Sequence, residues 1–251
     1  MIPYERIDTI FLDVGNTLIS IDFDWVAREL RDRGFGCLTE ELRRAEAAAR
    51  PGYSQRLFVD KLPEGTDLFL TYLQAMLGSL NSTCELAPGE LEALVKELRP
   101  VLRPDGRASA LWKMVMPRIP EALGRLRDLG LTLVVVSNSD GTVERSLDAA
   151  GLRPFFSVVV DSAVAGYEKP DPRIFAHALE RAGAIADRTL HIGDIYHADV
   201  LGARGAGIHA LMLDPYNDWP IDTLDGVERL PDLSAVADRL TAERRRLPSS
   251  R

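Results

Sequence analysis

Five short apolar runs divide the chain, and each of them ends at a polar residue or a glycine. None of the runs alternates strictly between apolar and polar positions, a pattern typical of strands that are buried on both faces of a parallel sheet. We therefore expect parallel strands at these places, each followed by a loop. The runs cover residues 7–12, 131–136, 156–160, 189–192 and 208–213.

Helical periodicity fills the gaps between these runs in the second half of the chain. Apolar residues recur at helical spacing over 119–129, and Gly130 follows as a stop signal. Asp171 and Pro172 predict a helix start, because Asp is a favoured N-cap residue and Pro suits the first helical position. The alternation of strand and helix predicts an α/β fold with a doubly wound, Rossmann-like parallel sheet.

Residues 19–113 contain no convincing strand pattern, and Leu91, Leu94 and Leu98 recur at helical spacing. We interpret this stretch as a helical bundle inserted after the first strand, with a turn at 100–106. The expected division is a core domain of residues 1–18 and 114–240, a helical domain of residues 19–113 and a flexible basic tail of residues 241–251.

The composition narrows the function classes. The 251 residues are 46% hydrophobic and 27% charged with a net charge of -8, so a broad basic face for nucleic acid is not expected. Cys37 and Cys84 are too few and too far apart for a disulfide framework, which favours a reducing compartment. The sequence shows no secretory pattern and no apolar run near the roughly 20 residues of a membrane span. We therefore expect a cytoplasmic protein that binds neither nucleic acid nor a membrane, while its oligomeric state is not indicated.

Polar residues follow three of the predicted strands. Asp13 ends the first run, Ser137 and Asn138 follow the second, and Asp194 follows the fourth. Because ligands bind outside the carboxyl ends of the strands in open parallel sheets, these side chains are expected to converge on one rim. Paired carboxylates there favour Mg²⁺, and Lys169 in a proline-rich loop is the candidate for neutralising the remaining charge.

Four segments together resemble the signature motifs of the haloacid dehalogenase superfamily. They occur in the order found in that family and span most of the predicted core. The helical insert also lies where one branch of the family has a cap domain, between the first and second motifs. The segments are residues 11–18 (FLDVGNTL), 136–138 (VSN), 168–175 (EKPDPRIF) and 191–207 (HIGDIYHADVLGARGAG).

The resemblance implies a phosphohydrolase that acts on a small phosphorylated metabolite. Asp13 would attack phosphorus and form an aspartyl-phosphate, with Lys169 offsetting negative charge between it and the phosphoryl group. Ser137 and the backbone at Asn138 would bind phosphate oxygens. The implied Mg²⁺ ligands are Asp13, the carbonyl of Gly15 and Asp194, with Asp199 supporting the metal directly or through water.

The chain departs from the family pattern at Gly15. Phosphatases of the family usually have a second Asp there, which protonates the leaving group and activates water, a contribution of about 10²–10⁴-fold in rate. A phosphatase in which water or His197 moves the proton is one interpretation. A catalytically weak binding or regulatory module is another.

Other chemistry on the same fold is the third interpretation. Dehalogenases of the family lack the metal carboxylates, so Asp194 and Asp199 argue against dehalogenation. Phosphonate hydrolases need a Schiff-base Lys from the cap, and Lys61 has no motif around it.

Several side chains have a structural and a functional interpretation. His191 lies in a strand pattern and is expected to be a buried, satisfied histidine. Tyr53 and Trp112 are expected to pack in the insert or its hinge. In the basic stretch of the insert, Arg50 or Arg56 is the candidate for reaching a substrate, against the alternative of a solvated helix face.

Overall fold

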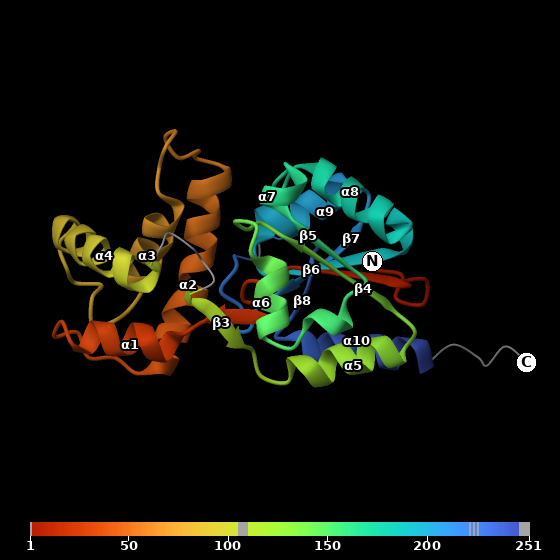
Figure 1. The fold of residues 1–251 in the computed structure, drawn as a ribbon, viewed down its shortest axis with the longest axis horizontal. Helices are drawn as coiled ribbons and strands as arrows, with labels where there is room; N and C mark the ends of the chain where they lie inside the picture. The colour runs from red at the N-terminus through yellow and green to blue at the C-terminus, as the bar shows by residue number, and fades with distance from the viewer. Residues whose placement is uncertain (1, 105–109, 221, 223, 225, 246–251) are drawn as a thin grey trace, which may run out of the picture.

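The computed structural model describes residues 2–104, 110–220, 222, 224 and 226–245. Its centre is a six-stranded, wholly parallel sheet with strand order β5-β4-β1-β6-β7-β8 (Figure 1). The five predicted strands are confirmed, and β8 adds a sixth that the sequence pattern did not reveal because it is short and half-buried. The strands are β1 (Thr9–Leu12), β4 (Thr132–Ser137), β5 (Val158–Asp161), β6 (Thr189–Gly193), β7 (His209–Leu213) and β8 (Glu228–Leu230).

Helices cover both faces of this sheet, which confirms the doubly wound α/β fold (Figure 1). One apolar cluster joins α5, α6 and α10 to the strand side chains of one face, and a second joins α8 and α9 to those of the other. The core helices are α5 (Ile119–Asp128), α6 (Val143–Ala149), α7 (Ser162–Ala165), α8 (Pro172–Ala182), α9 (Gly202–Gly205) and α10 (Leu233–Arg245), with the single turns η3 (Arg153–Phe155) and η4 (Ala186–Arg188) and the π-helix η5 (Tyr196–Leu201).

The predicted start of α8 is confirmed in detail. Asp171 is its N-cap, and the carboxylate accepts a hydrogen bond from the backbone N–H of Arg173. Pro172 occupies the first helical position, and Gly183 ends the helix in the left-handed conformation at φ +61°. This capping fixes where the preceding loop, which contains Lys169, enters α8.

In the described part of the insert between β1 and α5, four helices enclose an apolar cluster of their own. They are α1 (Phe23–Arg31), α2 (Thr39–Phe58), α3 (Leu68–Gly78) and α4 (Pro88–Leu102), and they lie to one side of the sheet in Figure 1. The predicted turn at 100–106 is wrong at its start, because Pro100 lies inside α4; residues 105 and 106 lie outside the described residues.

The expectation that 19–113 contains no strand is also wrong at both ends. The short strands β2 (Ile19–Ile21) and β3 (Trp112–Val115) pair with each other in antiparallel fashion where the chain leaves and re-enters the core. Each is too short to show an alternating pattern, and each is stabilised by pairing with the other across the 90 residues that separate them. The two crossings between core and insert are therefore tied together.

The predicted tail starts too early. Helix α10 continues to Arg245, and Arg244 donates hydrogen bonds to the carbonyls of Ile7 and Leu129, so residues 241–245 are ordered against the core. Residues 246–251 lie outside the described residues. Within the described part of the chain, no helix combines the length and apolar character that crossing a membrane requires.

Candidate active site

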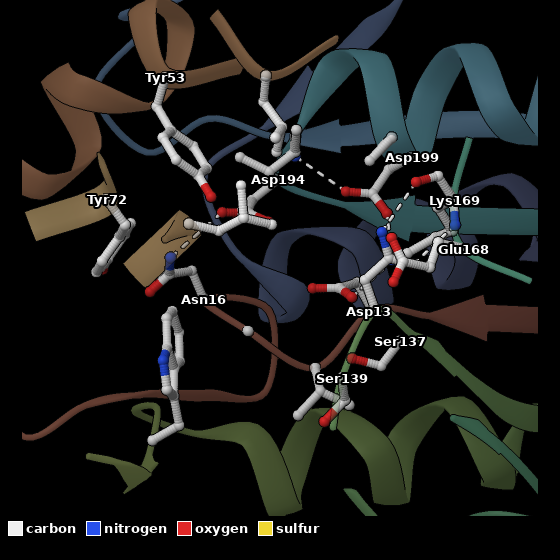
Figure 2. A pocket seen from close by; sticks show the side chains of 18 of the residues that line it. Asp13, Asn16, Tyr53, Tyr72, Ser137, Ser139, Glu168, Lys169, Asp194 and Asp199 are labelled. Carbon is white, nitrogen blue, oxygen red and sulfur yellow. Dashed lines mark hydrogen bonds and ion pairs between the residues drawn. The ribbon is translucent and has the colours of Figure 1, made fainter. Parts of the chain in front are cut away.

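The carboxyl ends of three neighbouring strands meet at one cavity of about 880 Å³. Asp13 follows β1, Ser137 ends β4 and Asp194 follows β6, and all three side chains are buried at the cavity wall. The convergence predicted from the sequence is therefore observed. Figure 2 shows Asp13, Ser137 and Lys169 together on one side of this cavity.

Lys169 connects two carboxylates at the floor of the cavity. Its Nζ lies 2.6 Å from Oδ1 of Asp13 and 2.6 Å from Oδ1 of Asp199 (Figure 2). The Asn138 side chain fixes the lysine backbone from the neighbouring strand end, accepting a hydrogen bond from the Lys169 N–H at 2.7 Å and donating one to its carbonyl at 2.9 Å. The Asn138 side chain thus holds the lysine loop, a role that sequence reasoning missed.

Burial and the paired charges shift the ionisation of this group. Burial raises the pKa of Asp13, and the Lys169 ammonium only partly opposes it. Burial alone would also raise the pKa of Asp199, but Lys169 and His191 outweigh that effect and lower it. Burial alone would lower the pKa of Lys169, whereas Asp13 and Asp199 raise it, so the lysine stays an ammonium.

Asp199 is held by donors on every side. Its Oδ2 accepts from the backbone N–H of Ile195 at 3.0 Å, and Nε2 of His191 lies 2.9 Å from its Oδ1. Gly193 packs so closely that any side chain there would overlap the Asp199 carboxylate. His191 is fully buried, as the sequence pattern predicted, but it is only half satisfied, because its Nδ1 has no hydrogen-bond partner among the described residues. The contact of its Nε2 indicates that it orients Asp199.

A second polar network links the insert to the core. Arg50 of α2 pairs with Glu46 one turn earlier, and its Nε lies 3.3 Å from Oδ2 of Asp194. The Asn16 amide donates to Glu46 at 2.9 Å and to Asp194 at 3.4 Å, and Tyr72 donates to Glu46 at 3.3 Å. Arg50 therefore reaches the rim, where it contacts a core carboxylate; Arg56 is exposed and does not line the cavity.

The charges around the rim do not balance within the described residues. Four buried carboxylates face two buried cations, Lys169 and Arg50. Burial raises the pKa of Asp194 to about 8, with Arg50 opposing and the neighbouring carboxylates adding to the shift. The four are Asp13, Glu46, Asp194 and Asp199.

The donor set and this charge excess fit a hard divalent cation. The described residues contain no group of three or more His, Cys, Asp or Glu side chains arranged as metal ligands. Mg²⁺ does not need such a group, because one or two carboxylates, a carbonyl and water commonly hold it. Asp13 and Asp194 with the Gly15 carbonyl make up a set of that kind, whereas both Asp199 oxygens already accept from protein donors.

Aromatic side chains from the insert line the outer part of the cavity. Tyr53, Tyr72 and Trp112 all belong to its wall. Trp112 also packs against the apolar cluster of the insert, as expected from the sequence. A Cβ placed on Gly15 would lie 3.2 Å from the Trp112 ring and 3.8 Å from Oδ2 of Asp13. The Trp112 ring thus borders the space that a side chain at residue 15 would enter.

His197 lies elsewhere than the proton-relay interpretation requires. Its Nδ1 lies 2.7 Å from Oγ of Ser54 on α2, its ring stacks on Phe58 at 6.0 Å, and it is not part of the cavity wall. Burial lowers the pKa of His197. We therefore assign it to the contact between insert and core.

Known proteins resemble this chain over most of its length. The model of the haloacid dehalogenase-like hydrolase family matches residues 7–207. A bovine haloacid dehalogenase-like hydrolase domain-containing protein 3 is 38% identical over 139 residues, which is 54% of this chain and 55% of that protein, so the chain spans about half the length of this relative. Pyrimidine 5'-nucleotidase YjjG of Escherichia coli is 26% identical over 238 residues, or 89% of this chain and 97% of that enzyme.

Solved structures support the fold. The HAD-hydrolase YfnB of Bacillus subtilis, solved with bound magnesium, superposes with a TM-score of 0.63 at 20% identity and covers 94% of this chain and 99% of that one. At this level of identity the likeness concerns the fold alone. The order of the four motifs, the parallel sheet and the family match agree, and the chain belongs to the haloacid dehalogenase-like hydrolase family.

Proposed function

We propose that this protein is a Mg²⁺-dependent phosphomonoester hydrolase in which Asp13 is the nucleophile. The observation that carries the proposal is the buried Asp13–Lys169 pair, which lines the same cavity as Ser137 and Asp194. The nucleotidase name of a relative that matches 89% of the chain supports the same class of reaction.

Four residues of the site have defined tasks in this reaction. Asp13 attacks phosphorus and becomes an aspartyl-phosphate, which water then hydrolyses. Lys169 offsets the charge that gathers on the transferring oxygens, and the Ser137 hydroxyl donates to one of them. Asp199 is a positioning residue, because its carboxylate holds the Lys169 ammonium at 2.6 Å. The Asp199 carboxylate is itself held by His191 and by the backbone N–H of Ile195.

The metal would be held by Asp13, the carbonyl of Gly15 and Asp194, with Asp199 acting on the site through Lys169. When bound, Mg²⁺ would shield the phosphate from the attacking carboxylate and polarise a phosphoryl oxygen. Arg50 contacts the same Asp194 from α2, so this residue connects the proposed metal site to the insert.

The domain division is part of the same proposal. The described residues up to 18 and from 114 to 245 would form the catalytic core, and residues 19–113 would form a cap that covers the rim and excludes water. The paired β2 and β3 make up the connection between them, and the Ser54–His197 and Arg50–Asp194 contacts join the two parts.

A phosphate-release screen tests this function directly. Inorganic phosphate should be released from at least one member of a panel of phosphomonoesters when Mg²⁺ is present. Halide release from 2-haloacids, with no phosphate release from any ester, would instead identify a dehalogenase.

Removal of the metal should abolish phosphate release. Excess chelator is expected to stop turnover, and added Mg²⁺ should restore it, because the four buried carboxylates of the described rim outnumber the two cations Lys169 and Arg50. Asp194→Ala should raise the Mg²⁺ concentration needed for half-maximal rate at least tenfold. It should also remove the increase in Tm that Mg²⁺ gives the parent protein.

A matched control separates the metal site from general effects on a buried carboxylate. Asp214 is buried after β7, pairs with Arg229 and lies outside the cavity wall. Asp214→Asn should leave the Mg²⁺ requirement unchanged even if it lowers Tm. Full turnover in excess chelator would contradict the metal proposal.

Gly15 should make the protein prefer good leaving groups. Without an acid at residue 15, an alkoxide departs nearly unprotonated, whereas a phenolate is stable as an anion, so aryl phosphates should react faster than alkyl phosphates. Gly15→Asp should raise the alkyl rate more than the aryl rate, by no more than about 10²–10⁴-fold. The φ angle of Gly15 is not positive, so the backbone permits a side chain, but the Trp112 ring at 3.2 Å must shift. Equal gains on both ester classes would show that another group supplies the proton.

A further inference from the structure

The cavity is much larger than the reacting phosphoryl group requires. Its volume of about 880 Å³ extends from Asp13 to side chains of α2, α3 and β3. Cavities of roughly 300–1,000 Å³ typically enclose most of a ligand the size of a drug molecule. The cavity therefore has room for a bulky leaving group.

The wall around that space is aromatic. Tyr53 and Tyr72 meet edge to face with ring centroids 5.9 Å apart, and Tyr72 and Trp112 are tilted by 41° at 5.8 Å. Phe58 and Phe69 extend the same wall. The three contacting rings are neither fully buried nor fully exposed, so part of each ring surface is accessible. Such a wall favours a planar ring, because edge-to-face and offset contacts between rings are attractive beyond simple burial.

The cations of the described cavity wall are already paired. Arg50 contacts Glu46 and Asp194, and Lys169 lies between Asp13 and Asp199. A third cation of the wall is likewise engaged by a carboxylate and an aromatic ring. That cation is Arg103, which is 3.5 Å from Asp140 and stacks over Phe69 at 5.5 Å, although its buried Nε has no hydrogen-bond partner among the described residues. A second anionic group on the substrate would therefore have to compete with the carboxylate that each of these cations already contacts.

The aromatic wall approaches the reacting centre itself. The point where a Cβ of Gly15 would stand is 3.2 Å from the Trp112 ring and 3.8 Å from Oδ2 of Asp13. The glycine thus leaves room beside the nucleophile, and that room borders an indole ring. Trp112 in turn contacts Tyr72, so the aromatic wall is continuous from Gly15 outward.

We infer that the substrate class is a phosphomonoester whose leaving group contains an uncharged aromatic ring, held against Tyr72 and Trp112. This inference rests on the proposed phosphatase function and adds to it the chemistry of the leaving group.

The test compares two esters that differ only in aromaticity. Benzyl phosphate and cyclohexylmethyl phosphate both release a primary alcohol with its ring one carbon away, so the comparison isolates ring recognition from leaving-group stability. The parent protein with Mg²⁺ should have a kcat/KM about tenfold higher for benzyl phosphate, the size expected from one or two favourable ring contacts. Phosphoglycolate, a small probe whose carboxylate is a second anionic group beside the phosphate, should be a poorer substrate than either.

Variants locate the effect. Tyr72→Leu and Trp112→Leu should each bring the ratio of the two kcat/KM values toward one. Tyr72→Phe should keep the ratio, because it removes only the hydroxyl that donates to Glu46. Trp25→Leu is the matched control, since Trp25 is a half-buried indole of α1 outside the cavity wall.

The outcomes separate the two proposals. A ratio near one in the parent protein, or a preference for phosphoglycolate, overturns the aromatic class and leaves the phosphatase function intact. A tenfold ratio that survives both leucine variants overturns the assignment to Tyr72 and Trp112. Absence of phosphate release from every ester overturns the phosphatase function, and this inference with it.

Discussion

Replacing Asp13 by Asn is expected to abolish turnover and leave the protein folded. The amide cannot attack phosphorus, so kcat for phosphate release should fall by on the order of 10⁴-fold or more, as for other enzymes that lose their nucleophile. Burial raises the pKa of Asp13, which means that the surroundings disfavour its charged form. A neutral isostere that can still accept from Lys169 should therefore keep the Tm within a few degrees of the parent.

A buried carboxylate outside the cavity serves as a control, because its replacement should affect stability and not the rate. Asp161 is buried at the end of β5 and accepts from the backbone N–H groups of Gly141 and Val143, but it does not line the cavity. Asp161→Asn should lower the Tm and keep the rate per folded molecule. If Asp13→Asn turned over at the parent rate, the nucleophile assignment would be wrong.

Replacing Lys169 by Ala should reduce both the rate and the stability. The ammonium is 2.6 Å from each of two buried carboxylates, so its removal leaves Asp13 and Asp199 without their common cation. Breaking a buried ion pair in this way costs about 3–5 kcal/mol of the free energy of unfolding, which denaturant titration would measure. Because the charge acts on the reacting centre, kcat should fall at least as much as substrate affinity.

Two further variants make the result specific. Lys96→Ala removes an exposed lysine paired with Glu92 and should change neither quantity measurably. Lys169→Arg keeps the charge but replaces a compact ammonium by a planar fork, so it should recover part of the stability and little of the rate. A rise in KM alone for Lys169→Ala would indicate simple substrate binding.

The sequence predicted the rim because the relevant signals are local. Asp13, Ser137 and Asp194 each follow an apolar run, and parallel strands bring their carboxyl ends to one edge. Lys169 was found because a proline-rich loop surrounds it. The helix start at Asp171 was equally readable, since capping depends on neighbouring residues alone.

The contacts that were missed join residues far apart in the sequence. Arg50 approaches Asp194 across 144 positions of the chain, and the residue pattern of α2 does not indicate which face of that helix meets the core. Trp112 approaches Gly15 only because β2 and β3 pair, and neither strand has a recognisable alternation. The position of His197 in the fourth motif suggested a proton relay at the rim, whereas its side chain pairs with Ser54 of the insert. These features depend on how the insert lies on the core.

Trapping the covalent intermediate tests the central claim most directly. The site lacks a carboxylate at residue 15 that could activate the water of the second step, so the aspartyl-phosphate should form faster than it is hydrolysed. Rapid mixing with an aryl phosphate and Mg²⁺, acid quench and mass spectrometry of the peptides should show a burst of phenol matched by one phosphoryl group on Asp13. Asp13→Asn should show neither signal. A burst with the phosphoryl group on another residue, or steady turnover with no label on Asp13, would contradict the account.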